Sequence, residues 1–139
     1  MNRNDFRSKF EYELAKELEK NKIPFEYEPC QLDYDSPVYQ GKCLDCGSKQ
    51  VCSPRKYTPD FYLPEQDIYL EAKGKFVAQN RTKMLSVIES NPDLDIRMVF
   101  MRDNWLTKKK AKRYSDWCEQ KGIKYCVGTS IPKGWLNER

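Results

Sequence analysis

One segment, residues 57–73, constrains the fold of this chain more than any other. Two runs within it, 57–63 and 68–73, have the composition of short strands. The four residues between them read Pro-Glu-Gln-Asp, which favours a tight turn. If the turn closes symmetrically, Leu63 faces Ile68 and the strands form an antiparallel hairpin. The core of this protein should therefore contain a β-sheet.

This hairpin brings ionisable side chains together. Counting outwards from the turn places Asp60 opposite Glu71 on one sheet face, and Lys73, two residues beyond Glu71, shares that face. Like charges opposite each other destabilise a sheet, so the pair requires a compensating cation or exposure to water. We expect Mg²⁺ or Mn²⁺, bound by Asp60, Glu71, the backbone carbonyl of Ala72 and a phosphate oxygen. Lys73 would then hold or activate an attacking water.

A helix predicted over residues 8–21 supplies another carboxylate. Glu11 shares the apolar face with Leu14, Ala15 and Leu18. An acid on that face is costly unless it reaches a partner or a site. Glu11 is therefore a candidate site residue, and the alternative is a helix-edge acid at the boundary of the core.

Strands and helices are expected to alternate along the remaining chain. In 139 residues this order predicts one α/β domain with a central mixed β-sheet flanked by helices. The predicted elements are a strand from Phe25 towards Leu32, a helix over 82–89 with Leu85 and Ile88 inward, a buried strand over 96–101, a helix over 107–122 with Thr107 as N-cap and Gly122 as C-cap, and a strand over 123–127. We also expect Trp135 to pack back on the domain.

Composition excludes several classes of function. The chain has no histidine, so Ser-His-Asp and Cys-His nucleophile systems and histidine metal ligands are excluded. It has neither an N-terminal apolar leader segment nor a run of about 18 apolar residues, so we expect a soluble, intracellular protein without a membrane partner. The net charge is +4, with the basic residues concentrated in the C-terminal half.

Six cysteines in an intracellular chain are thiols or metal ligands before they are disulfides. Residues 35–56 form an irregular insertion rich in Ser, Pro, Gly and Cys, within which Cys43-Leu44-Asp45-Cys46-Gly47 has the form of a zinc knuckle. Cys30 and Cys52 would complete a tetrahedral structural Zn²⁺ site. The alternative is that these are reduced thiols. Cys118 and Cys126 are predicted core positions without a function.

Basic residues crowd the first turns of the predicted 107–122 helix. Cations oppose the helix dipole there, so local stability does not explain them, whereas contact with DNA phosphates does. A solvated charged face is the alternative. The candidates for DNA contact are Lys108, Lys109, Lys110, Lys112 and Arg113, together with Arg7, Arg81 and Lys83.

Pro59-Asp60 followed by Glu71-Ala72-Lys73 resembles the PD…(D/E)xK signature of the restriction-endonuclease-like nucleases. Within that superfamily the chain resembles the phage endonuclease I family of Holliday-junction resolvases. The matching stretches are Phe6-Arg7-Ser8 with Glu11, Ile23-Pro24-Phe25-Glu26-Tyr27-Glu28, Tyr57-Thr58-Pro59-Asp60-Phe61, Glu71-Ala72-Lys73-Gly74, Pro92-Asp93-Leu94-Asp95-Ile96-Arg97 with Val99-Phe100, and Gly122-Ile123-Lys124. By position, the resemblance implies the catalytic set Glu11, Asp60, Glu71 and Lys73.

The resemblance further implies a homodimer that cuts four-way or other branched DNA in the cytoplasm of a phage-infected host, each protomer nicking one strand. Family members exchange elements between protomers through a bridge before the Pro-Asp strand, where this chain carries its Cys-rich insertion instead. We therefore expect a metal-dependent DNA endonuclease. The alternatives are a nuclease of the same fold acting on linear duplex, and a zinc-dependent DNA-binding module without catalysis.

Overall fold

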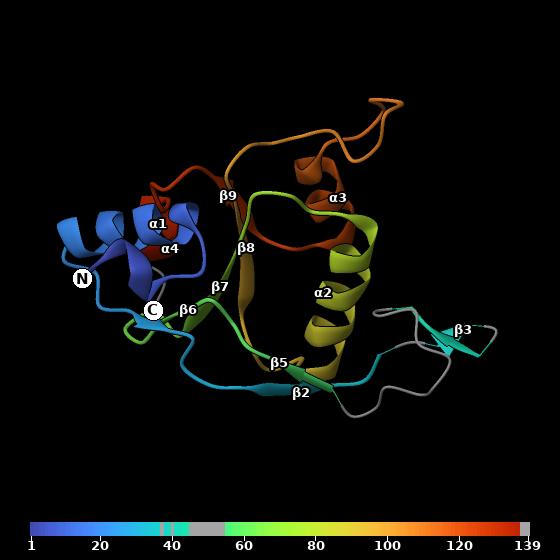
Figure 1. Cartoon of the computed structure of the whole chain (residues 1–139), viewed down its shortest axis with the longest axis horizontal. Helices are drawn as coiled ribbons and strands as arrows, with labels where there is room; N and C mark the ends of the chain where they lie inside the picture. The colour runs from blue at the N-terminus through green and yellow to red at the C-terminus, as the bar shows by residue number, and fades with distance from the viewer. Residues whose placement is uncertain (37, 40, 45–54, 137–139) are drawn as a thin grey trace.

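The computed structural model describes residues 1–36, 38–39, 41–44 and 55–136. Its core is a five-stranded sheet in the order β1-β6-β7-β8-β9 (Figure 1). The pairs β1–β6 and β6–β7 are antiparallel, whereas β7–β8 and β8–β9 are parallel. This confirms the expected central mixed sheet. Its strands are β1 Glu26–Tyr27, β6 Phe61–Leu63, β7 Ile68–Lys73, β8 Ile96–Phe100 and β9 Tyr125–Val127.

The central hairpin has the predicted register. Leu63 pairs with Ile68, and the turn closes with the N–H of Asp67 donating to the carbonyl of Leu63 at 2.8 Å. The predicted strand 57–63, however, is wrong as a single element. It is split into β5 (Arg55–Tyr57) and β6, because Pro59 lacks the N–H that a continuous ladder needs.

A second predicted strand is also interrupted. The run from Phe25 towards Leu32 forms β1 and then β2 (Leu32–Tyr34), separated by Glu28, whose φ is +47°. A left-handed residue cannot continue an extended strand, so the chain turns away from the sheet at this point. β2 then pairs with β5 as a separate antiparallel ribbon, which lies beside α2 (Figure 1).

One face of the sheet is covered by α1 (Lys9–Lys20) and α4 (Lys133–Leu136) (Figure 1). The Ser8 side chain caps α1 by accepting a hydrogen bond from the N–H of Glu11 at 3.1 Å. Leu14 and Leu18 pack into one core cluster with sheet residues and with Trp135, as predicted. An amphipathic helix thus buries its apolar stripe on the hairpin.

The other face is covered by α2 (Ala78–Ser90) and α3 (Tyr114–Lys121) (Figure 1). Met84 and Val87 form the buried stripe of α2, whereas the predicted inward residues Leu85 and Ile88 flank that stripe and are only partly buried. Every residue of β8 is buried, because helices cover both of its faces.

The predicted helix over 107–122 is wrong in its first half. α3 begins at Tyr114 and its N-cap is Arg113 rather than Thr107. Its C-cap is Gly122, whose φ is +72°, as predicted. Four lysines at the positive end of a helix dipole would oppose helix formation, whereas Asp116 lies in the first turn of the observed helix and accepts from the N–H of Arg113 at 2.9 Å.

Residues 104–113 instead form an arm that we call the lysine hairpin (Figure 1). The N–H of Tyr114 donates to the carbonyl of Asn104 at 2.9 Å, and that of Leu106 donates to the carbonyl of Lys112 at 2.8 Å. Trp105 and Arg113 are bridged across it. The turn closes where Lys110 has a φ of +52°. The lysines therefore lie in the turn and the returning segment of this arm rather than on a helix.

Within the insertion, β3 (Val38–Tyr39) pairs with β4 (Lys42–Cys43). Cys46 and Cys52, two of the predicted zinc ligands, lie outside the described residues. None of the helices in the described part of the chain has the length and apolarity that crossing a bilayer requires.

Candidate active site

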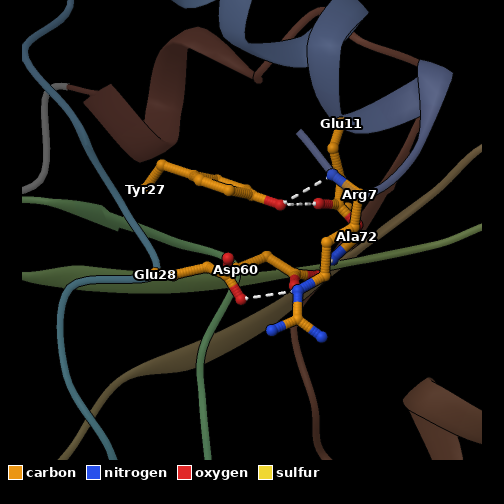
Figure 2. A network of polar contacts seen from close by, with 6 residues as sticks. All are labelled: Arg7, Glu11, Tyr27, Glu28, Asp60 and Ala72. Carbon is orange, nitrogen blue, oxygen red and sulfur yellow. Dashed lines mark hydrogen bonds and ion pairs between the residues drawn. The ribbon is translucent and has the colours of Figure 1, made fainter. Parts of the chain in front are cut away.

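Asp60 lies just before β6, at the end of the sheet where β7 extends beyond β6; we call this place the corner of the sheet. β7 extends to Lys73, but its neighbour β6 begins only at Phe61. The N–H of Ala72 donates instead to Oδ2 of Asp60 at 2.9 Å (Figure 2). The other carboxyl oxygen, Oδ1, accepts no hydrogen bond from any described residue. Asp60 is thus fixed by one oxygen and can offer the other to a ligand.

Glu71 is more constrained. Only 5% of this residue is exposed, and both carboxylate oxygens have partners. The hydroxyl of Tyr57 donates to Oε1, and Nζ of Lys73 lies 3.1 Å from Oε2. Glu71 and Lys73 therefore share one face, as the strand alternation predicts, and Lys73 remains 26% exposed. The lysine can reach a ligand while the glutamate holds it in place.

Glu11 comes from α1, on the opposite face of the sheet, and is buried, as the sequence pattern predicts. The hydroxyl of Tyr27 donates to Oε1 of Glu11 and accepts from the N–H of Arg7 at 3.1 Å. Figure 2 shows these side chains beside Asp60. The sheet has a corner here, so an acid from the helix can approach an acid from the strands.

The three carboxylates influence one another. The pKa of Asp60 is raised to about 9 by burial first and by the charges of Glu71 and Glu11 next, whereas the Ala72 N–H and Lys73 act to lower it. Without a cation, Asp60 therefore keeps its proton at neutral pH. Metal ligation requires ionised carboxylates, so a divalent cation bound here would displace that proton.

No described group of three or more Asp, Glu, Cys or His side chains is already arranged around a metal position. Asp60, Glu71 and the carbonyl of Ala72 remain the predicted ligands, and Glu11 lies next to them.

The predicted DNA-contact residues fall into two groups. Nε of Arg7 lies 2.9 Å from Oε2 of Glu28 at the rim of the acid cluster (Figure 2), and Nζ of Lys83 lies 5.7 Å from the ring centroid of Tyr57. Arg81 lies near the start of α2 and donates to the carbonyl of Phe76 at 2.6 Å, so it also supports the loop before that helix. All three lie close to the elements that carry the acids.

The second group is the lysine hairpin. Lys108, Lys109, Lys110 and Lys112 are exposed, and none forms an ion pair with another described residue. The guanidinium of Arg113 stacks 4.0 Å from the ring centroid of Trp105. The hairpin follows β8, whose continuation is joined to the site where the N–H of Met101 donates to the carbonyl of Lys73 at 3.0 Å. The arm that carries these lysines therefore starts close to Lys73.

The predicted zinc ligands are not assembled among the described residues. Cys30 is exposed and hydrogen-bonds with the side chain of Tyr69 on β7, whereas Cys43 is buried in β4. Cys118 and Cys126 are buried, as predicted, and burial raises the pKa of each thiol to about 12. The two core cysteines therefore stay protonated at neutral pH.

Three residues of the site were not predicted from the sequence: Tyr27, Tyr57 and Glu28. Tyr27 stands between Glu26 and Glu28, and Tyr57 stands between Lys56 and Thr58, so only the aromatic rings themselves suggest burial, where a phenol hydroxyl must find an acceptor. Nothing in a local pattern indicates which acceptor that is, since Tyr27 is 16 residues from Glu11 and Tyr57 is 14 residues from Glu71.

A mixed sheet that carries two acids and a lysine at one corner fits the family that sequence comparison identifies. The model of the phage endonuclease I family matches residues 1–139, and the chain belongs to that family. It is 37% identical over 134 residues to "Endonuclease I" of Escherichia phage T7, a match that covers 96% of this chain and 79% of that protein. It is also 37% identical over 119 residues to "Endodeoxyribonuclease 1" of Enterobacteria phage T3, covering 85% and 68%.

Proposed function

We propose that this chain is a DNA endonuclease that hydrolyses phosphodiester bonds with the help of Mg²⁺ or Mn²⁺. The observation that carries the proposal is the corner at which Asp60, flanked by the Glu71 and Glu11 charges, has one unoccupied carboxyl oxygen beside Lys73. The names of the T7 and T3 relatives, an endonuclease and an endodeoxyribonuclease, support the same activity.

The protein's contribution is to place charge. Asp60, Glu71 and the carbonyl of Ala72 would hold the cation, with Glu11 adding negative charge nearby. A bound divalent cation supplies Lewis-acid stabilisation of the phosphate and a more acidic water. Lys73, kept in place by Glu71, donates a hydrogen bond to the attacking water or to a phosphate oxygen on which negative charge grows. These four side chains form the proposed catalytic set.

DNA would be held by exposed cations on either side of this site. Arg7 stands at the rim of the acid cluster, and the lysine hairpin extends from the end of β8. Phosphate contacts fix the position of a duplex without reading its sequence, so such a surface suits recognition of DNA shape.

The finer form of the proposal is a homodimer that resolves Holliday junctions by paired nicks, one from each protomer. This finer form rests on family membership. The dimer follows from the reaction, because two opposed nicks in one junction require two active sites. Cleavage of linear duplex by the same site is the second candidate.

The decisive experiment compares a four-way junction with a linear duplex of matched sequence, in Mg²⁺ or in EDTA. The proteins are wild type, Lys73→Ala and the control Lys75→Ala, which removes an exposed lysine two residues away. We expect symmetric, metal-dependent nicks in the junction, abolished in Lys73→Ala and kept in Lys75→Ala. Equal cutting of both DNAs would remove junction specificity, and no cutting by wild type would remove the endonuclease proposal.

A structural Zn²⁺ ion bound by Cys30, Cys43, Cys46 and Cys52 is also a proposal. Zinc analysis of the purified protein should give one ion per chain, reduced by Cys43→Ser and unchanged by Cys118→Ser, because Cys118 is a core position. Wild-type protein without zinc would contradict it.

A further inference from the structure

Two tyrosine hydroxyls donate to two of the candidate acids. Tyr57 donates to Oε1 of Glu71, and Tyr27 donates to Oε1 of Glu11. Each tyrosine is the last residue of its strand, Tyr57 of β5 and Tyr27 of β1. The same type of contact is thus made twice, from two strands that belong to different sheets.

The Tyr57 contact is enclosed. Only 3% of Tyr57 and 5% of Glu71 are exposed, so neither group can exchange its partner for bulk water. The remaining oxygen of Glu71 faces Nζ of Lys73 at 3.1 Å. With one oxygen fixed by a phenol and the other by an ammonium group, the carboxylate has one defined orientation.

The Tyr27 contact has a defined direction. The hydroxyl oxygen accepts from the N–H of Arg7 at 3.1 Å, so the single hydroxyl proton is free to point at Glu11 (Figure 2). The ring is held edge-on against Phe6, at 4.7 Å between centroids. Oε2 of Glu11 accepts no hydrogen bond from any described residue, so it remains available to a ligand.

The ends of the two strands also lie next to Asp60. The N–H of Glu28, directly after Tyr27, donates to the backbone carbonyl of Asp60 at 2.9 Å. Tyr57 is separated from Asp60 by Thr58 and Pro59 alone. A shift of either tyrosine would therefore move the backbone that carries Asp60.

We infer that Tyr27 and Tyr57 are positioning residues, which orient the carboxylates of Glu11 and Glu71 around Asp60 for binding a divalent cation. The inference rests on the proposed function for the identity of the site, and it adds the groups that set its geometry. Removing a partner that orients a metal ligand typically changes metal affinity or activity about 10–100-fold.

The test uses Tyr27→Phe and Tyr57→Phe, which keep each ring and remove each hydroxyl. Mn²⁺ binding to the DNA-free protein is measured by calorimetry, and kcat and KM are measured for DNA cleavage. We expect Mn²⁺ affinity to fall about 10–100-fold in each variant. At a fixed, limiting concentration of metal, kcat should fall while KM for DNA stays unchanged, because neither hydroxyl contacts DNA.

Tyr62→Phe is the matched control. Its hydroxyl donates to Oδ1 of Asp67 at 2.8 Å, a tyrosine–carboxylate bond in the same sheet but at the hairpin turn. It should leave Mn²⁺ affinity and kcat unchanged. If all three variants bind Mn²⁺ as wild type does, or if the site variants lose only stability in urea unfolding, the positioning role is overturned.

A double-mutant cycle separates orientation from a general loss of structure. If Tyr57 acts through Glu71, then Tyr57→Phe should no longer lower Mn²⁺ affinity in a Glu71→Gln background. Full additivity would overturn that assignment. Wild-type protein that binds Mn²⁺ without cutting DNA would remove the proposed function and leave this inference standing, whereas wild-type cleavage with unaltered Tyr→Phe variants would remove this inference alone.

Discussion

The acid cluster and the lysine hairpin are the two charged regions of this molecule, and they are built in opposite ways. In the acid cluster, Glu71 is 5% exposed and bonded through both oxygens, and Asp60 is fixed by the Ala72 N–H. In the hairpin, the four lysines are exposed and form no ion pair with another described residue. In the acid cluster hydrogen bonds and burial fix individual side chains, whereas in the lysine hairpin the charged side chains are free to adapt.

The difference follows from what each region must bind. A cation and a reacting phosphate require groups held to within a fraction of an ångström, which only packing and hydrogen bonds can supply. A DNA backbone presents a repeating charge over a long path, and flexible ammonium groups can follow it without a fixed register. Substitutions in the acid cluster should therefore change kcat, whereas substitutions in the lysine hairpin should change DNA binding.

Removing a catalytic acid should give the largest effect. Asp60→Asn keeps the shape of the side chain and removes its charge, so we expect kcat to fall on the order of 10³-fold, the scale of losing one member of a catalytic set. DNA affinity, measured by gel shift in EDTA at neutral pH, should be unchanged, because Asp60 is already protonated and uncharged when no cation is bound. A variant that cuts normally but binds DNA poorly would reverse the comparison.

Removing hairpin charge should change binding and leave the chemical step intact. For Lys109→Ala with Lys110→Ala, we expect the slope of log K against log salt to become shallower by about 0.9 for each DNA phosphate that the hairpin no longer neutralises. The kcat at saturating DNA should be unchanged. Lys20→Ala with Lys121→Ala removes equal charge from the last turns of α1 and α3 and is the control. Equal slopes for the two double variants would show that the hairpin has no special contact with DNA.

The buried acids should also make the metal-free protein sensitive to pH. The pKa of Asp60 is raised from 3.8 to about 9 in the folded protein, so between these values the unfolded chain loses a proton that the folded protein keeps. The free energy of unfolding therefore falls as pH rises through this window. Urea unfolding in EDTA at several pH values should show the decline, and Asp60→Asn should reduce it. Equal pH profiles of the two proteins would contradict the assignment.

The smallest effect should come from the stem of the hairpin. Trp105→Ala removes the ring on which Arg113 stacks at 4.0 Å, an interaction worth roughly 0.5–1 kcal/mol at an exposed site. KM for DNA should rise a few-fold with kcat unchanged, because the arm is less ordered before DNA binds. Trp105→Phe keeps an aromatic ring and should behave almost as wild type. A fall in kcat would instead connect the hairpin to the chemical step.

Sequence reasoning succeeded where the relevant residues are close along the chain. The Leu63–Ile68 register, the shared face of Glu71 and Lys73, and the inward Glu11 all follow from strand or helix periodicity over a few residues. Periodicity is local, and the backbone satisfies it whatever the tertiary fold.

It failed where a distant partner or a competing local interaction decides the structure. The chain leaves the sheet at Glu28, which has a left-handed backbone conformation and donates its N–H to the carbonyl of Asp60. The helix expected from Thr107 does not form, because backbone hydrogen bonds from Tyr114 to Asn104 and from Leu106 to Lys112 close a hairpin there. Asp116 caps a helix that starts later. The periodicity of apolar and polar residues along the sequence does not encode these contacts.

The β2–β5 ribbon marks a place where the chain can gain or lose residues without disturbing the rest of the fold. Tyr34 pairs with Arg55, so the segment 35–54 begins and ends at neighbouring positions. The start of this segment is also held by α2, because the N–H of Asp35 donates to the hydroxyl of Ser90 at 3.1 Å. Closing a longer loop costs little, about 0.6 kcal/mol for each doubling. Evolution can therefore exchange or enlarge residues 35–54 as a cassette, acquiring new binding properties while the acids a few residues beyond Arg55 stay where they are.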